Sequence, residues 1–160
     1  MDFFAHLLWA YIVYGKLVPF QDLLQSMAFT VAPDFVWGIP VFAEYLRRKS
    51  RGKIVVFRTL HEEWKDFKAI YYFSHSFVLM VLLFILTSVL ASKFYLPVLY
   101  GWGLHILLDM FLHKGSLGNK PLYPFLQYKI NGFVHWSDKR VLILNWILIA
   151  AFLLVIYILF

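Results

Sequence analysis

Four histidines and two aspartates stand in otherwise apolar stretches of this chain. They are His6, Asp34, His75, His105, Asp109 and His113. A titratable side chain is expensive to place inside a membrane, so each of them is a candidate functional group. Imidazole suits zinc, copper, iron and nickel, and added carboxylates favour zinc, iron or manganese. The chain contains no cysteine, which excludes thiolate ligands, disulfides and a cysteine nucleophile.

The clearest spacing joins His105 to Asp109. Residues four apart lie on the same face of a helix, so the side chains of this pair can bind a single divalent ion together. Together with His6, Asp34 and His75 it offers three histidines and two carboxylates. Such a set can hold one ion with an open position, or two ions bridged by a carboxylate. An open position is what a hydrolytic metal requires, because its bound water must reach the substrate.

Structural explanations compete with this interpretation at single positions. Asp34 follows Pro33 and can cap the start of a helix. Ser74 and Ser76 can bond back to the helix that carries His75. A single histidine near a helix end is usually interfacial or structurally hydrogen-bonded, so a site must be argued from the whole set.

The remaining histidines are predicted to be structural or solvated. His113 and Lys114 precede Gly115, which is typical of the cationic C-terminus of a helix. His61 and His135 fall in expected loops, where most histidines are solvated bystanders. These three histidines are therefore left out of the predicted site.

Composition places the chain in a membrane. Of its 160 residues, 62% are hydrophobic, 21% are aromatic and only 15% are charged, with a mean hydropathy of +0.71. Soluble domains are about 25% charged and about 45–50% apolar. A soluble globule, a disordered tail and a coiled coil are therefore excluded. We expect an all-α integral membrane protein with one domain, 1–160.

Five apolar stretches are each close to the ~20 residues that a helix needs to cross the hydrocarbon core. They are 3–20, 21–39, 69–91, 94–114 and 141–160. The second is interrupted by Asp22, Pro33, Asp34 and Gly38 and is followed by Pro40. After it, 41–51 is first apolar and then basic, which predicts a separate helix in the membrane interface. The first stretch lacks a basic start and a cleavage site, so we expect it to be retained rather than removed as a signal peptide.

The positive charges predict the orientation. Eight of the fifteen Lys and Arg lie in 47–68, and five more lie from Lys114 to Arg140. The loops 47–68 and 115–140 are separated by two spans, so both lie on one face. The positive-inside rule places these loops and the N-terminus in the cytoplasm, with the protein in the plasma (inner) membrane and its C-terminus outside.

The five candidate ligands agree in depth within this topology. At a rise of ~1.5 Å per residue, four spans each carry a His or Asp roughly 5–15 Å below the cytoplasmic surface. Scattered polar residues would not agree in this way, whereas one polar site between the helices would. We therefore predict an intramembrane site for one or two ions, with zinc preferred and iron or manganese as alternatives.

The order of the motifs resembles that of the YdjM-like family of inner-membrane, metal-dependent hydrolases. In this chain it runs His6, Pro33-Asp34, Ser74-His75-Ser76, Gly103-x-His105-x-x-x-Asp109, Gly115, Gly118 and Pro-Leu-Tyr-Pro-Phe at 121–125. The family carries an early His, a Pro-Asp, a Thr-His-Ser, a His-x-x-x-Asp, a Gly-rich turn and a Leu-x-Pro. The pattern is also similar to that of bacterial zinc-dependent phospholipase C. The likeness covers about residues 3–126. The usual His-Arg before the Thr-His-Ser and a second acid after the Pro-Asp are missing here.

The residues and the resemblance together imply metal-dependent hydrolysis of a phospholipid or another lipid phosphoester in the cytoplasmic leaflet. Asp34 or Asp109 would act as general base or as a bridging ligand. Ser74 or Ser76 would orient the ring of His75 through a hydrogen bond.

The substrate is expected to come from the bilayer, and no nucleic acid is expected as a partner. Lys114, Lys120 and Arg140 would hold an anionic head group, beside a pocket mouth formed by the turn at 115–125. The last span has no Asp, Glu, Lys, Arg or His, so we expect it to pack or to form a homodimer.

Three other function classes fit part of the pattern. His75 and His105 could be the axial ligands of a b-type haem, although this leaves Asp34 and Asp109 unexplained. Intramembrane His and Asp also relay ions in transporters, although two matched halves are missing. The polar groups could instead tie helices together in a scaffold without catalysis. The basic loop 47–68 would bind anionic lipid or a soluble partner in any of these cases.

Overall fold

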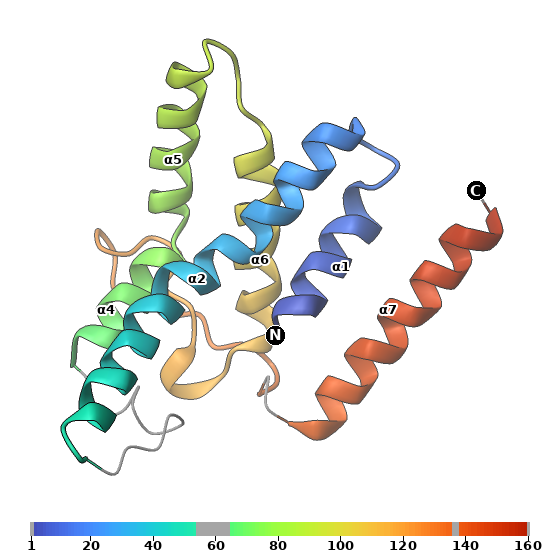
Figure 1. Ribbon diagram of the computed structural model, residues 1–160. Coiled ribbons are helices and arrows are strands. Elements are labelled where there is room, and N and C mark those ends of the chain that lie inside the picture. Colours follow the sequence, from blue (N-terminus) through green and yellow to red (C-terminus); the bar gives the residue numbers. More distant parts are fainter. Residues whose placement is uncertain (1, 54–64, 136–137, 160) are drawn as a thin grey trace.

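The computed structural model describes residues 2–53, 65–135 and 138–159. Within these ranges the chain is helical, with an isolated bridge between Asn119 and Ile130 and no strand. The helices are α1 (Phe3–Tyr14), α2 (Phe20–Ser50), α4 (Lys65–Ser74), α5 (Phe77–Leu90), α6 (Pro97–Leu112) and α7 (Lys139–Leu159), with a 3-10 turn η1 at Gly115–Leu117 (Figure 1). The predicted all-α class is confirmed.

The second predicted span is longer than expected. α2 runs without a break through Pro33 and Pro40, so the prediction of a separate interfacial helix at 41–51 was wrong. Each proline removes one backbone hydrogen bond, but α2 packs against α1, α4 and α6, and tertiary packing overrides helix propensity. Asp34 therefore lies in the interior of a helix and does not cap one.

The third predicted span is instead two helices. α4 and α5 meet at an angle of 57°, and His75 and Ser76 form the break between them. Ser76 caps α5 by accepting from the backbone N–H of Leu79 at 3.2 Å. The N–H of Phe77 donates to the carbonyl of Pro121 at 2.8 Å, which satisfies a donor in the first turn of α5. The break therefore places the His75 side chain at a junction of two helices rather than on a continuous helix face.

Several helices have the apolar character that membrane insertion requires. Among the described residues, α2 and α7 are long and apolar enough to cross a membrane, and the bent α4–α5 pair makes a third candidate. α1 and α6 are apolar but shorter, with 12 and 16 residues. α5 has no buried residue, and α7 exposes apolar side chains along its length. Apolar surface of this extent is typical of helices that face lipid.

Segments far apart in the sequence share the same end of the molecule. Figure 1 shows the C-terminal end of α2 beside the segment that follows α6, at the lower end of the view. The connections α1–α2 and α5–α6 lie at the opposite end, as does the C-terminal end of α7. α7 stands apart from the other helices and contacts α1, where Trp9 Nε1 donates to Asn145 Oδ1 at 2.9 Å.

The closest helix contact is between α2 and α6. A Cβ atom at Gly101 would lie 2.1 Å from the carbonyl oxygen of Ser26 and 2.7 Å from the backbone nitrogen of Thr30. Only glycine allows the two backbones to approach so closely. His105 follows Gly101 by one helical turn, so this approach brings its ring against α2.

Candidate metal centre

The five predicted ligands converge on one place in the fold. His6 comes from α1, Asp34 from α2, and His105 and Asp109 from α6, while His75 lies at the α4–α5 break. The side chains of His6, His75, His105 and Asp109 are buried, whereas that of Asp34 is 24% exposed. Four separate segments therefore meet here. α6 contributes two of the polar side chains, and the other three segments contribute one each.

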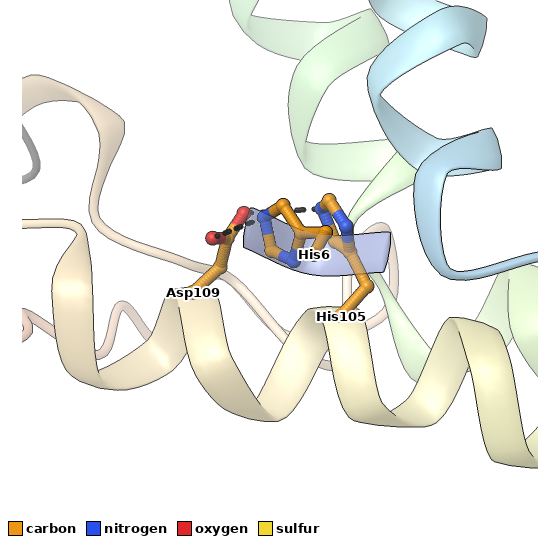
Figure 2. A group of neighbouring side chains, drawn as sticks. All are labelled: His6, His105 and Asp109. Carbon is orange, nitrogen blue, oxygen red and sulfur yellow. Dashed lines mark ion pairs between the residues drawn. The ribbon is translucent and has the colours of Figure 1, made fainter. Parts of the chain in front are cut away.

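Asp109 is the centre of this cluster. Its Oδ2 lies 3.1 Å from Nε2 of His105 and 3.5 Å from Nε2 of His75. Its Oδ1 lies 3.4 Å from Nε2 of His6. Figure 2 shows His6 and His105 side by side, with the Asp109 carboxylate facing both rings. The two rings are stacked with their centroids 4.0 Å apart.

Asp34 completes the cluster from the opposite helix. Its Oδ1 lies 3.7 Å from Nε2 of His75 and 3.9 Å from Nε2 of His105. The indole Nε1 of Trp37, one turn further along α2, donates to the same oxygen at 3.2 Å. Because Asp34 is the most exposed of the five, it marks the side on which the cluster opens.

These separations suit ligands around a metal ion. Ligand atoms at about 2.0–2.1 Å from a tetrahedral ion lie about 3.4 Å from one another. The N–O distances here run from 3.1 to 3.9 Å, mostly longer than N–H···O hydrogen bonds of about 2.7–3.2 Å. Two groups bring their ligand atoms within 4.8 Å of one another, namely His6, His105 and Asp109, and Asp34, His75 and His105. The chain thus contains buried His/Asp groups that could hold a metal ion.

Backbone carbonyls fix the tautomers of two of the histidines. Nδ1 of His105 lies 2.7 Å from the carbonyl oxygen of Thr30, and Nδ1 of His75 lies 2.9 Å from that of Tyr71. A carbonyl can only accept, so each Nδ1 carries a proton and donates it. For a neutral imidazole the Nε2 lone pair then points into the cluster.

The inward nitrogens have no other partner in the described part of the chain. Nε2 of His75, Nε2 of His105 and both ring nitrogens of His6 are buried without a hydrogen bond there. A buried polar atom left in this state costs about 1–3 kcal/mol. A cation bound by the Nε2 atoms and the two carboxylates would remove that cost at the Nε2 atoms. The Nδ1–H donor behind the Nε2 atom of His75 and of His105 is the usual arrangement for metal-bound histidine.

Of the two serines beside His75, only Ser74 touches its ring. Ser74 Oγ donates to the carbonyl of Tyr71 at 3.0 Å and lies 2.8 Å from Nδ1 of His75. Its lone pair is therefore available to the Nδ1–H of His75. Ser76 Oγ instead donates to the carbonyl of Phe73 at 2.8 Å and caps α5, which is the structural role weighed for it in the sequence.

The segment after α6 folds over the α4–α5 break. Leu117 accepts from the Tyr71 hydroxyl at 3.1 Å, and Pro121 accepts from the N–H of Phe77. A Cβ atom at Gly132 would lie 2.5 Å from the carbonyl oxygen of Phe111, so the end of this segment also packs tightly on α6. The predicted pocket mouth at 115–125 therefore lies against the α4–α5 break, where His75 is placed.

The three predicted head-group residues differ in their surroundings. Lys114 and Arg140 are exposed. Lys120 is partly buried. Its Nζ donates to Gln127 Oε1 at 2.8 Å and lies 4.5 Å from the ring centre of Tyr72. Lys129, which the sequence analysis did not single out, donates to the carbonyl of Gly115. Partial burial and the nearby charges of Lys120 and Lys68 lower the pKa of Lys129.

The histidines left out of the predicted site have different outcomes. His135 is exposed, and His61 lies outside the described residues. His113, in contrast, is 7% exposed, and its Nε2 lies 3.4 Å from Oδ1 of Asp109. The signal was present in the sequence, because His113 follows Asp109 by four residues just as Asp109 follows His105. Its position shortly before Gly115 favoured a helix C-terminus, so the four-residue spacing from Asp109 was not used to place His113 in the site.

The ring geometry does not match a haem ligated by His75 and His105. The ring centroids lie 4.9 Å apart, and both Nε2 atoms approach the same oxygen of Asp109. Axial ligands of a haem face each other across the macrocycle. These two rings instead converge on one point beside a carboxylate.

Comparisons of the chain with family models, curated proteins and solved structures give no match. The resemblance to YdjM-like hydrolases therefore stays a prediction, supported by the residues that carry it. The site must be interpreted from its own geometry.

Proposed function

We propose that this protein is a membrane-embedded, metal-dependent hydrolase that acts on a phospholipid or another lipid phosphoester. The observation that carries the proposal is the pair of carbonyl-locked histidines, His75 and His105, whose Nε2 atoms converge on Asp109. A scaffold does not need buried lone pairs that face a carboxylate, because such an arrangement is costly without a cation.

The two carboxylates have different environments and hence different proposed roles. Asp109 is buried and contacts histidines through both oxygens, so it acts as the central ligand. Asp34 is partly exposed beside the same histidines, so it is the group that can meet incoming water and substrate. We therefore assign Asp34 the role of general base as well as ligand.

A zinc, iron or manganese ion held by these residues would lower the pKa of a bound water toward ~7 and polarise a phosphoryl oxygen. Asp34 accepts a proton from the attacking water. The water oxygen forms a bond to phosphorus, the ester P–O bond breaks, and the leaving alkoxide takes up the proton that Asp34 removed from the water, which returns Asp34 to its carboxylate form. His75 stays oriented throughout by its contacts with Ser74 and Tyr71.

Apolar surface around Asp34 supports a lipid substrate. On α2, Phe35 and Ile39 are 50% and 64% exposed, and on α1 Phe4 is 65% exposed. Phe3 packs edge-on against Phe35 at 5.3 Å, which joins α1 and α2 on this side. A lipid could reach Asp34 laterally across this surface without leaving the bilayer.

The membrane arrangement forms part of the same proposal. We propose that α1, α2, the α4–α5 pair, α6 and α7 make five crossings of the inner membrane, with the basic segments 47–68 and 115–140 on the cytoplasmic side. In Figure 1 the C-terminal end of α2 and the segment that follows α6 lie at the same end of the molecule, and this placement supports the proposed topology. The metal site would then serve the cytoplasmic leaflet, where Lys114, Lys120 and Arg140 can attract an anionic head group.

A lipid-hydrolysis assay tests the proposal. The protein, purified in detergent and loaded with Zn²⁺ or Mn²⁺, is incubated with mixed micelles of phosphatidylethanolamine, phosphatidylglycerol and phosphatidic acid, and the products are identified by mass spectrometry. We expect a water-derived cleavage product from at least one lipid, its loss in Asp34→Asn, and its retention in His135→Ala. Equal product from the wild type and Asp34→Asn would contradict the assigned chemistry.

A further inference from the structure

We propose that the centre binds two metal ions bridged by the carboxylate of Asp109, and that His113 is a ligand of the second ion. This inference rests on the proposed metal-dependent function and deepens it. The sequence interpretation left the number of ions open and did not count His113 among the ligands.

The number of inward side chains exceeds what one hydrolytic ion uses. A catalytic zinc typically takes three protein ligands and keeps one position open. Six residues converge here, which are His6, Asp34, His75, His105, Asp109 and His113. Six residues, with one carboxylate shared between the ions, give each of two ions at least three protein ligands.

The two oxygens of Asp109 face different histidines. Oδ2 is directed to His75 and His105, which lie within reach of Asp34 as well. Oδ1 is directed to His6 and His113, each with Nε2 at 3.4 Å. The first ion is therefore assigned to Asp34, His75 and His105, and the second to His6, Asp109 and His113, with Asp109 Oδ2 reaching the first ion.

The spacing of the rings fits a bridged pair. His6 and His105 stack with centroids 4.0 Å apart and planes 21° from parallel, and they point to opposite oxygens of the same carboxylate. Ions in two-metal hydrolytic sites lie about 3.5–4 Å apart. Stacked rings at this separation can each serve one of the two ions.

Tyr71 fixes the orientation of His113. Its hydroxyl lies 3.1 Å from the carbonyl oxygen of Leu117 and 2.5 Å from Nδ1 of His113. The carbonyl can only accept, so the hydroxyl donates its single proton there and accepts from Nδ1–H of His113. The Nε2 lone pair of His113 then faces Asp109, as the Nε2 lone pairs of His75 and His105 do. Tyr71 is thus a positioning residue for the second ion.

Metal stoichiometry tests the inference. The full-length protein is purified in detergent, stripped, reloaded with Mn²⁺ and measured by elemental analysis and electron paramagnetic resonance. We expect two Mn²⁺ per chain with an exchange-coupled spectrum in the wild type and in His135→Ala. His113→Ala should hold one Mn²⁺ with an uncoupled spectrum.

A milder variant protects the test against misfolding. Tyr71→Phe keeps the ring and removes the hydroxyl, so it should weaken the second ion about 10–100-fold and leave the first in place. Tyr72→Phe is the matched control and should keep both ions at wild-type affinity. If His113→Ala aggregates, the Mn²⁺ affinity of Tyr71→Phe alone tests whether His113 binds the second ion.

The outcomes separate this inference from the proposed function. A wild type that holds one Mn²⁺ and cleaves lipid would overturn the two-ion centre and leave the hydrolase in place. Two coupled ions in His113→Ala, or in Tyr71→Phe at unchanged affinity, would overturn the assignment of His113 and Tyr71. A wild type that holds no metal would remove the basis of both proposals.

Discussion

The carbonyl oxygen of Thr30 on α2 lies 2.7 Å from Nδ1 of His105 on α6, and this contact decides which nitrogen of His105 faces the cluster. It exists because Gly101, one turn before His105, lets the two helix backbones touch. Helix packing and ligand orientation are thus one property of the α2–α6 contact.

Gly101→Ala tests this coupling. The added Cβ would lie 2.1 Å from the Ser26 carbonyl oxygen, so the helices must separate and His105 must leave Thr30. Overpacking of this kind costs about 1–3 kcal/mol. We expect a lower melting temperature in detergent together with reduced metal content. Gly103→Ala is the matched control, because its Cβ would meet only the Met80 sulfur at 3.4 Å. Similar metal loss in both variants would refute the role of the close contact.

Substitution of the two serines beside His75 should have different effects, on metal affinity for Ser74 and on stability for Ser76. Ser74→Ala removes the hydroxyl next to Nδ1 of His75, and we expect metal affinity to fall about 10–100-fold. Ser76→Ala removes the cap of α5, and we expect a loss of about 1 kcal/mol in stability with unchanged metal affinity. Competition with a fluorescent zinc chelator, alongside thermal melting, measures both effects. A reversed pattern would show that Ser74 does not orient the ring.

The two carboxylates should also differ. Asp109→Asn removes the charge that four histidines face, so we expect bound metal to be lost together with activity. Asp34→Asn keeps an amide oxygen as a weak ligand and removes the base, so we expect most of the metal to remain while turnover falls about 10²–10⁴-fold. Metal content and lipid turnover are measured on the same preparations. Full activity in Asp34→Asn would assign the base elsewhere.

Removal of the metal should destabilise the fold. A ligand at about 100 times its dissociation constant stabilises the native state by about 2.7 kcal/mol. We expect a chelator to lower the melting temperature of the wild type and added Zn²⁺ to restore it. The double variant His105→Ala/Asp109→Ala, which lacks a ligand of each ion, should show neither change. An identical melting temperature with and without chelator would show that the cluster is satisfied without an ion.

The sequence predicted the all-α class and the five residues that converge, because both depend on local composition and on periodicity. His105 and Asp109 share a helix face by spacing alone, and the apolar surroundings of His6 and His75 mark them as unusual. The partner of each ring could not be predicted, since the Thr30 and Tyr71 carbonyls reach the histidines only through helix packing and the α4–α5 break.

Two differences from the sequence prediction have a common cause. Proline predicts a helix end, yet α2 continues through Pro40 because its neighbours hold it. His113 lies two residues before Gly115, which predicts a helix terminus. It does follow the last residue of α6, but it also faces Asp109. Local signals describe what a segment prefers by itself, whereas these positions are decided by contacts across the fold.

Elemental analysis of the purified protein tests the central claim most directly. The wild type, the double variant His105→Ala/Asp109→Ala and the control His135→Ala are purified in detergent, passed through gel filtration and reloaded with Zn²⁺. The account predicts bound ions in the wild type and the control, two per chain for the bridged centre, and none in the double variant. No ion in the wild type after reloading would contradict it and leave the histidines and aspartates as hydrogen-bonding contacts between helices.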